Sequence, residues 1–222
     1  MGVPEKTKKA VVFGTGKFAE VVDFYLGVDS NYDVVAFTAT EGGGSFRGKP
    51  IIAFDAFTDF YPPDSYSLFV AVGYTKLNVL RQRFCEEARS KGYTLLSYIS
   101  SRATEWESST VGDNVFIFED NTIQPFVTIG DGVVLWSGNH VGHHASIGSY
   151  TFVSSHVVIS GQCKIGNNCF IGVNATIADG VVIGDRNLIG AGALIEKATG
   201  QDEAYFAQRT VKFSRSATWF FK

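Results

Sequence analysis

The sequence predicts two folds in one chain, a small Rossmann-like α/β domain followed by an all-β parallel β-helix. Strand and helix signals alternate over residues 8 to about 100, as in a doubly wound parallel sheet. From Thr110 onward the chain repeats every six residues, a period that fits neither an α-helix nor an ordinary strand. We therefore expect an N-terminal domain at 1–103, a β-helical domain at 104–200 and a C-terminal segment at 201–222.

The composition argues against several classes of protein and of binding partner. The chain has 222 residues, of which 45% are hydrophobic and 18% charged, as in a soluble globular protein. Its net charge of −3 argues against a nucleic-acid partner, and no apolar run reaches the roughly 20 residues needed to span a membrane. The charged start lacks a signal peptide, and three cysteines without CxxC spacing indicate reduced thiols. We expect a cytoplasmic protein without a membrane span.

The elements of the first domain follow from apolar runs and their spacing. Such runs predict buried parallel strands at 9–14, 33–38, 67–73 and 94–100. Helical spacing after the first strand predicts a helix, and a second helix is expected between Thr75 and Gly92, which can cap its two ends. Together these elements predict one small parallel sheet.

The first turn, GTGKFA, is a candidate phosphate-binding loop. Gly14 and Gly16 lie between a strand and a helix N-terminus, where backbone N–H groups can hold a phosphate. A dinucleotide fingerprint would have a third glycine at Ala19 and an acid at the end of the second strand, where Thr38 and Thr40 stand. The loop therefore favours a mononucleotide or a nucleotide-linked sugar over NAD, and a tight turn without a ligand is the alternative.

The second half can be cut into fifteen hexads, from Thr110 to Thr199, without an insertion. The second residue of all fifteen is Ile, Val or Leu, and the third is Gly in eight of them. Three hexads make one triangular coil of 18 residues, so the repeat predicts five coils. The second residue points inward and the small sixth residue fits near the axis, so that Cys163 and Cys169 fill the core rather than bind a metal.

One face of the predicted prism is rich in large apolar side chains. Its outward residues are Phe116, Phe118, Val134, Trp136, Phe152, Phe170 and Leu188. A soluble monomer rarely exposes such a strip, so we expect the face to be buried in a homotrimer. The alternative is that the first domain or the C-terminal segment covers it.

All four histidines lie between positions 140 and 156. His143 takes the fourth place of its hexad, at a corner of the prism, and the same corner holds Gly161 one coil later. An imidazole would thus lie about one strand spacing from a backbone amide that no side chain covers. This pairs a candidate general base with a candidate oxyanion donor, while a solvated corner histidine is the alternative.

Five stretches carry a resemblance to a known family: VVFGTGKFAEVV, VAVGYTKLNVLR, HVGHHASIG, ISGQCKIGNNCFIGVNATI and IGAGALI. Residues 8 to about 205 resemble the sugar acyltransferases with a nucleotide-binding N-terminal domain and a left-handed parallel β-helix of hexapeptide repeats. The sialic acid O-acetyltransferases and the bacillosamine and perosamine N-acetyltransferases belong to this family. The resemblance implies an acetyl-CoA-dependent homotrimer with active sites in grooves between subunits.

The resemblance also implies roles for individual residues. His143 would be the base and Gly161 the oxyanion amide; where the family flanks its base with a carboxylate, this chain has Gly142 and His144, so His144 is a candidate to orient His143. The nucleotide-linked sugar would lie near Gly14, Gly16, Lys17, Phe18, Thr38, Gly73, Tyr74 and His140. Coenzyme A would lie along Gly161, Ala178, Gly190 and Ala191, with Lys212 a candidate for its phosphates or a solvated surface residue.

The function expected is N-acetylation of a nucleotide-linked amino sugar in surface-polysaccharide synthesis, such as that of a lipopolysaccharide O-antigen, without a metal. O-acetylation of a related sugar is the near alternative. A histidine-metal enzyme of the β-helical carbonic anhydrase type is a different class, for which His140, His144 and His156 would be ligands. A non-catalytic binding protein is the third class.

Overall fold

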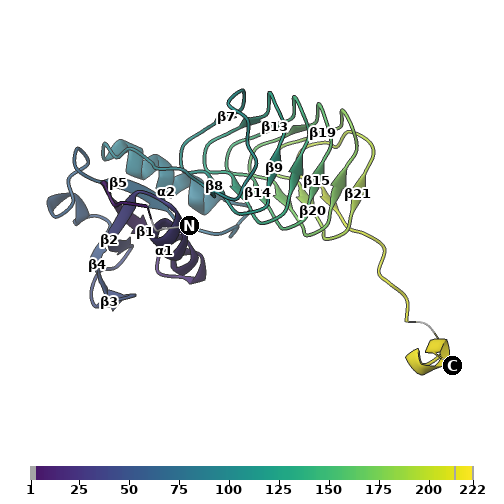
Figure 1. The fold of residues 1–222 in the computed structure, drawn as a ribbon, viewed down its shortest axis with the longest axis horizontal. Coiled ribbons are helices and arrows are strands. Elements are labelled where there is room, and N and C mark those ends of the chain that lie inside the picture. The colour runs from purple at the N-terminus through teal and green to yellow at the C-terminus, as the bar shows by residue number, and fades with distance from the viewer. Residues whose placement is uncertain (1–3, 213, 222) are drawn as a thin grey trace.

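The computed structural model describes residues 4–212 and 214–221 and contains both predicted parts, which lie side by side along the long axis (Figure 1). The first part is a five-stranded sheet with a helix on each face, and the second is a parallel β-helix of three long, narrow sheets. The Rossmann-like domain followed by a parallel β-helix is therefore confirmed. The last residues leave the β-helix and end in a short 3₁₀ turn, η2 (Ala217–Phe221).

The N-terminal sheet has the strand order β3-β4-β2-β1-β5. Its strands are β1 (Lys8–Phe13), β2 (Tyr32–Ala39), β3 (Ser45–Phe46), β4 (Lys49–Ala53) and β5 (Ser67–Val70). All neighbouring pairs are parallel except β3 and β4, which form an antiparallel edge. A 3₁₀ turn, η1 (Phe57–Asp59), precedes β5. Because β1 is central, its apolar run is buried on both faces, as the sequence predicts.

Helices α1 (Lys17–Asp29) and α2 (Val79–Ser90) cover the two faces of this sheet. The second helix begins later than predicted, because Lys76, Leu77 and Asn78 all have a positive φ and cannot continue a right-handed helix toward its N-terminus. The loop from β5 to α2 is therefore held in a backbone conformation that the spacing of apolar residues does not reveal.

The segment at 94–100 differs from its prediction. Only Leu95 bridges to β5, whereas β6 (Tyr98–Ile99) pairs with the first strand of one β-helical sheet. At the other end, β22 (Ala204–Tyr205) extends the same sheet. The β-helical pairing thus runs from Tyr98 to Tyr205, beyond both ends of the predicted 104–200.

Three parallel sheets form the faces of the β-helix. The first face contains β7 (Thr110–Val111), β10 (Thr128–Ile129), β13 (Ser146–Ile147), β16 (Lys164–Ile165) and β19 (Val182–Ile183). The aromatic face contains β6, β8 (Phe116–Ile117), β11 (Val134–Leu135), β14 (Phe152–Val153), β17 (Phe170–Ile171), β20 (Leu188–Ile189) and β22. The third face contains β9 (Thr122–Ile123), β12 (His140–Val141), β15 (Val158–Ile159), β18 (Thr176–Ile177) and β21 (Leu194–Ile195).

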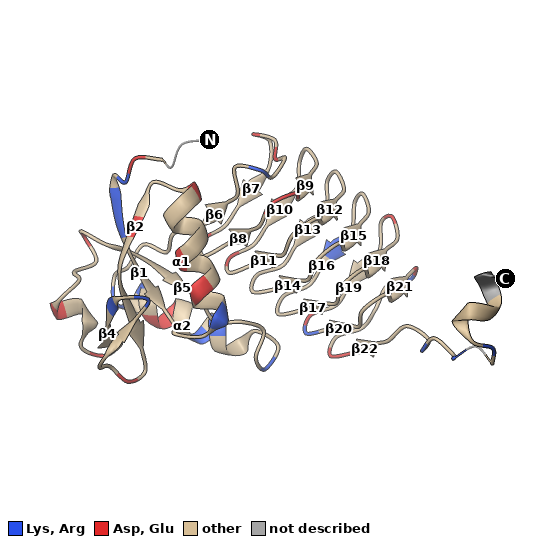
Figure 2. Ribbon diagram, turned by 60° about the horizontal axis from the view of Figure 1, so that its bottom comes forward, with Lys and Arg blue, Asp and Glu red and all other residues tan. Residues whose placement is uncertain are grey.

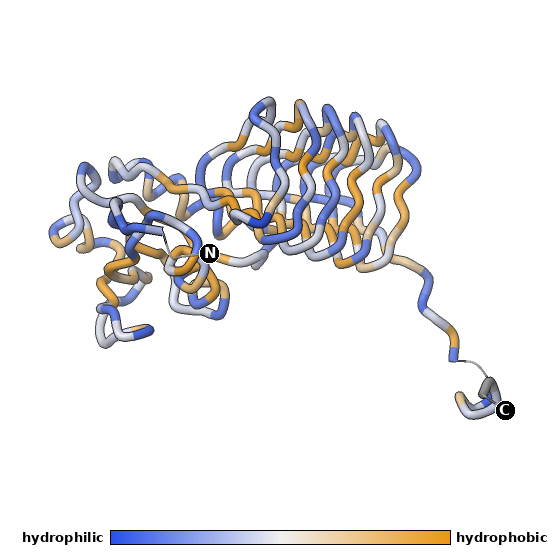
Figure 3. The backbone as a smooth tube through the Cα atoms, viewed as in Figure 1, coloured by the Kyte–Doolittle hydropathy of each residue, from blue (hydrophilic) through white to orange (hydrophobic). Residues whose placement is uncertain are grey.

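The register between coils is the one that the hexads predict. Within each face a strand of one hexad pairs with the strand 18 residues away, as Thr128 pairs with Thr110 and with Ser146. Few charged residues occur along these strands (Figure 2), and hydrophobic positions align from coil to coil (Figure 3). The inward residues form one continuous core that includes Cys163 and Cys169, both fully buried. Their assignment to the core is confirmed.

The expected trimer contact through the aromatic face is wrong, because the N-terminal domain of the same chain covers that face. Phe116 is fully buried and Phe118 and Phe152 nearly so, in one cluster with α1 and the central strands of the N-terminal sheet. Phe18 reaches from α1 to the rings of Phe116 and Trp136. Full burial of such a side chain is worth roughly 1.5–3 kcal/mol, so this contact holds the two domains together. The alternative named above accounts for the strip.

No helix among the residues at 4–212 and 214–221 is long and apolar enough to cross a membrane.

Candidate functional site

The fourth residue of each hexad lies at one of three corners of the prism. The corner between the first and aromatic faces, here called the ladder corner, holds Asp113, Asp131, Ser149, Asn167 and Asp185. The corner between the third and first faces, the open corner, holds Pro125, His143, Gly161, Asp179 and Lys197. The corner between the aromatic and third faces, the pocket corner, holds Glu119, Ser137, Ser155, Val173 and Ala191.

At the open corner the imidazole of His143 lies over Gly161 of the next coil. Its Cε1 and Nε2 atoms are each 3.0 Å from the point where a Cβ of residue 161 would lie. Any residue other than glycine would place a carbon atom in that space, so Gly161 leaves room beside the ring nitrogen. The structure brings these two residues together as the 18-residue spacing predicts.

The backbone N–H of Gly161 is a free donor. Gly161 is buried as a residue, yet its N–H donates no hydrogen bond to any residue at 4–212 or 214–221. A backbone N–H without a protein partner is open to solvent or to a ligand oxygen. At this corner such an oxygen would lie beside the imidazole of His143.

His144 is placed to orient the ring of His143. The two Nδ1 atoms are 3.2 Å apart, a hydrogen bond in which one ring must donate and the other accept. His144 has a positive φ, and its ring packs against Phe126 at 4.7 Å between centroids, which fixes its direction. A side chain at position 142 would collide with the backbone nitrogen of Gly161, so a flanking carboxylate has no room there. His144 can therefore accept the hydrogen bond of the His143 Nδ1–H where a carboxylate is absent, which leaves Nε2 of His143 unprotonated.

A pocket of about 420 Å³ lies between the N-terminal domain and the pocket corner. Of the residues predicted to bind the sugar nucleotide, Lys17, Phe18, Gly73 and Tyr74 line it, and the ring of Tyr74 packs against Phe152. The side of the pocket formed by the β-helix comes from Trp136, Phe152, Ser154, Ser155 and Val173.

The remaining residues of the glycine loop lie beside or beneath this pocket. Gly16 is the N-cap of α1, and Gly14 has a φ of 116°, which favours glycine. Thr38 is fully buried, and its carbonyl accepts a hydrogen bond from the N–H of Gly14 at 2.8 Å. Thr38 therefore supports the loop from below, and the structure does not bring it into the pocket.

Arg81 holds the loop that carries Gly73 and Tyr74. Its guanidinium is fully buried and donates to the carbonyls of Val72 and Gly73 and to two carbonyls of the β-helix, at Gly132 and Tyr150. Burial lowers the pKa of Arg81 to about 10, which still leaves it charged at neutral pH. This residue fixes one wall of the pocket to the second domain.

The other predicted positions are spread over the β-helix. His140 lies on the third face, in β12, and His156 lies at the turn of the pocket corner, over Gly138. Within the described part of the chain, no three His, Cys, Asp or Glu side chains are grouped to hold a metal, so His140, His144 and His156 do not converge in one chain.

The positions expected to contact coenzyme A lie at both edges of the third face and beyond it. Ala178 is next to Asp179 at the open corner, whereas Gly190 and Ala191 lie at the pocket corner. Gly190 is buried, and a Cβ there would meet the ring of Phe206. Lys212 is exposed on the segment that leaves the last coil, apart from the other three positions.

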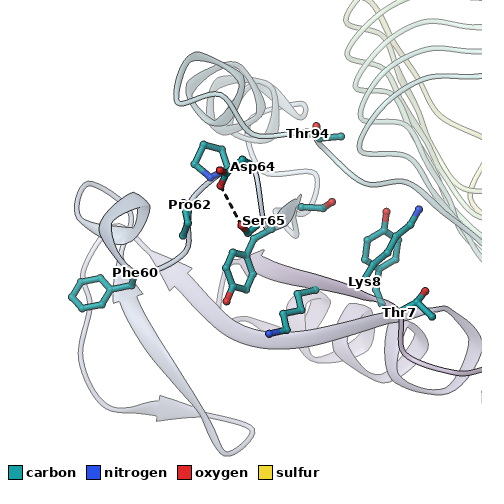
Figure 4. A pocket seen from close by; sticks show the side chains of 12 residues that line it. Thr7, Lys8, Phe60, Pro62, Asp64, Ser65 and Thr94 are labelled. Atoms are coloured by element: carbon teal, nitrogen blue, oxygen red, sulfur yellow. Dashed lines mark hydrogen bonds between the residues drawn. The ribbon is translucent and has the colours of Figure 1, made fainter.

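A larger cavity, of about 800 Å³, lies at the start of β1 and β5 (Figure 4). None of the predicted site residues lines it. Its two lysines, Lys8 and Lys9, lie over the rings of Tyr32 and Tyr66, and Ser65 donates to Asp64. These side chains satisfy one another, and we assign no chemistry to this cavity.

Comparison with known proteins connects the β-helix to a family. Residues 162–197 match the family described as bacterial transferase hexapeptide (six repeats). These residues belong to the upper coils, so this part of the β-helix is similar to that family. No curated protein sequence matches the chain.

Solved structures extend the similarity to both domains of the chain. The acetyltransferase domain of PglB from Neisseria gonorrhoeae, also solved with acetyl coenzyme A, is 25% identical with a TM-score of 0.78, and the match covers 89% of this chain and 96% of that one. PerB from Caulobacter crescentus, solved with CoA and GDP-perosamine, is 26% identical with a TM-score of 0.79, covering 89% and 93%. The family resemblance expected from the sequence is thereby confirmed.

The structure adds residues that sequence reasoning did not assign to the site. Trp136 and Phe152 line the pocket as well as burying the domain contact. Arg81 lies on the buried side of α2 with Phe84 and Ala88, but its charged side chain gave no sign in the sequence of full burial. Asp179 lies at the open corner 36 residues after His143, and the 18-residue spacing that pairs His143 with Gly161 would have found it at the next step.

Proposed function

We propose that this chain transfers the acetyl group of acetyl-CoA to the amino group of a nucleotide-linked sugar, in cytoplasmic synthesis of a surface polysaccharide. The observation that carries the proposal is the imidazole of His143 beside the free N–H of Gly161. The acetyl coenzyme A bound by the PglB domain and the CoA and GDP-perosamine bound by PerB support this pair of substrates.

The geometry of the open corner suits direct transfer. Nε2 of His143 accepts a proton from the amine as the nitrogen lone pair attacks the thioester carbon. The N–C bond forms, the carbonyl oxygen becomes an oxyanion, and the N–H of Gly161 donates to it. The C–S bond then breaks, and the imidazolium returns the proton so that coenzyme A leaves as a thiol. His144 holds the ring of His143 throughout.

The two substrates would occupy different surfaces. The nucleotide-linked sugar fits the pocket of Lys17, Phe18, Gly73 and Tyr74, with a phosphate at the glycine loop and the N-terminus of α1. The pantetheine arm of acetyl-CoA would run along the third face between Ala178 and the Gly190–Ala191 turn, and Lys212 would meet its phosphates.

A second copy of the chain is needed to bring the two surfaces together. The pocket corner and the open corner are separate edges of the third face, so one chain does not bring its own pocket to its own His143. We propose a homotrimer in which the pocket of one chain approaches the open corner of its neighbour. Because the aromatic face is covered, the contacts use the other two faces. A native mass of three chains by light scattering is expected, and a mass of one chain contradicts this arrangement.

The decisive test of function is a panel of acceptors. The protein is incubated with acetyl-CoA and UDP-, GDP- or dTDP-linked amino sugars, GDP-perosamine among them, and free thiol is measured. Each amino sugar is matched with its hydroxyl counterpart. Thiol release with an amino sugar alone supports the proposal. Release with the hydroxyl sugars instead indicates an O-acetyltransferase, and release with none of them rejects the proposed activity.

A further inference from the structure

The carboxylate of Asp179 faces the same small space as the imidazole of His143. Asp179 Oδ1 lies 3.0 Å from the point where a Cβ of Gly161 would be, and Nε2 of His143 lies 3.0 Å from the same point. The two atoms are therefore separated by no more than twice that distance. Two hydrogen-bonding groups thus converge, from the coils before and after Gly161, on a gap that the missing side chain leaves open.

Asp179 does not cap a backbone N–H of the neighbouring coil, as the acid and amide side chains of the ladder corner do. There, Oδ1 of Asp131 accepts the N–H of Asp113 at 3.0 Å, and Oδ1 of Asp185 accepts the N–H of Asn167 at 2.7 Å, each across one coil. Asp179 has the equivalent position relative to Gly161. Nevertheless, its carboxylate makes no hydrogen bond or ion pair with any residue at 4–212 or 214–221, and the N–H of Gly161 stays free.

The electrostatic surroundings leave the charge of Asp179 available to a ligand. Charged residues are few along the β-helical strands (Figure 2). Lys197, the next residue of the open corner, forms no ion pair with Asp179 in the described part of the chain. An exposed carboxylate that points at a base is therefore open to a cation that binds between the two.

A sugar amine is such a cation. Aliphatic amines are largely protonated at neutral pH, and an ammonium donates three hydrogen bonds. A hydrogen bond that involves a charged group is about twice as strong as one between neutral groups, and an ammonium is in addition attracted by the charge of the carboxylate, as a neutral sugar hydroxyl is not.

We infer that Asp179 binds the acceptor as its ammonium ion and makes the site selective for a primary amine over a hydroxyl. This inference rests on the proposed function and deepens it. The ammonium loses one proton to solvent by way of the Asp179 carboxylate, which frees the lone pair. The resulting amine attacks the thioester and gives its second proton to His143. Overall, one ammonium and one acetyl-CoA yield one amide, one thiol and one proton.

The test compares Asp179→Asn and Asp179→Glu with the wild-type protein. The acceptor is GDP-perosamine, or the amino sugar of the panel that releases thiol fastest. We expect Asp179→Asn to raise KM for this acceptor about 10- to 100-fold, as for a lost hydrogen bond between charged groups, with KM for acetyl-CoA unchanged. Asp179→Glu, which keeps the charge, is expected to restore most of the loss.

Asp185→Asn is the matched control, because it removes the same charge from the ladder corner and keeps an acceptor oxygen. It should leave both KM values at the wild-type level. If wild-type protein releases thiol and Asp179→Asn has an unchanged acceptor KM, the inference about Asp179 is overturned while the proposed function stands. If wild-type protein releases no thiol with any acceptor, the proposed function itself fails. Thermal unfolding of each variant checks that it is folded.

Discussion

The ladder corner and the open corner are built on the same repeat and differ in what their side chains do. At the ladder corner, four successive backbone N–H groups donate to the side chain one coil further on, at 2.7–3.2 Å. Among the fourth residues of the open corner, His143 alone has an N–H with a side-chain acceptor in the described part of the chain, namely Gln124. Gly161 and Asp179 have none in the described residues.

On the proposed function, this difference separates stability from chemistry within one scaffold. The backbone positions of both corners are equivalent because the hexad fixes them, so a polar side chain at either corner could cap the coil below. The ladder corner uses this possibility fully. The open corner leaves a peptide N–H and a carboxylate without partners among the described residues, beside an imidazole that bonds to His144, so it lacks the capping hydrogen bonds of the ladder corner.

The largest effect is expected from removing the proposed base at the open corner. His143→Ala should lower turnover at least about a hundredfold, the contribution of a general base, and should leave the protein folded because the ring is exposed. Turnover is measured by thiol release with the best acceptor, and folding by thermal unfolding and native mass. Unchanged turnover in a folded protein would show that the open corner is not the site of chemistry.

Filling the gap at the open corner should have the next largest effect. In Gly161→Ala the added methyl lies 3.0 Å from the imidazole and from the carboxylate of Asp179, in the space assigned to the reacting atoms. Turnover should fall about 10- to 100-fold, because the displaced groups no longer meet the substrate at the required distances. Gly161 has no positive φ, so alanine fits its backbone.

Gly27→Ala provides the matched control for this substitution. Gly27 lies inside α1, and an added Cβ there meets nothing within 4 Å. This variant should keep full activity and unfold at a slightly higher temperature, since alanine is favoured over glycine in a helix by roughly 0.5–1 kcal/mol. Equal activity of Gly161→Ala and Gly27→Ala would contradict the proposal that Gly161 leaves space for the reacting atoms.

The sequence alone predicts most of the two corners, because the position of a residue in its hexad determines both the register between coils and the corner at which it lies. His143 and Gly161 could be paired before any coordinates, and the register of all five coils follows from one phase. The aromatic strip was also visible, but its partner was not. The hexad period and the apolar residues show that the aromatic face must be covered. They do not show that the N-terminal domain covers it, because that depends on how the two domains pack.

Residues that act through the backbone were also beyond the sequence. Arg81 donates to four backbone carbonyls. Every residue has such a carbonyl, so the sequence does not reveal which ones accept a hydrogen bond. The positive φ of Lys76, Leu77 and Asn78 delays α2, although the side chains of Lys76 and Leu77 do not favour that conformation. Thr38 was expected at a ligand because it ends a strand, and burial beneath Gly14 could not be foreseen from that position.

The smallest effect on activity, and a measurable one on stability, is expected at the ladder corner. In Asn167→Ala the N–H of Ser149 loses its acceptor, 2.8 Å away, which should cost about 1 kcal/mol and lower the unfolding temperature by about 2–4 °C. The kcat and KM values should stay at the wild-type level, because the ladder corner is a different edge of the prism from both the pocket and His143. Thermal unfolding and thiol release measure the two effects separately. A loss of activity without a loss of stability would contradict the roles given to the two corners. It would mean that the ladder corner, whose backbone N–H groups are capped, binds the substrate, and that the open corner does not.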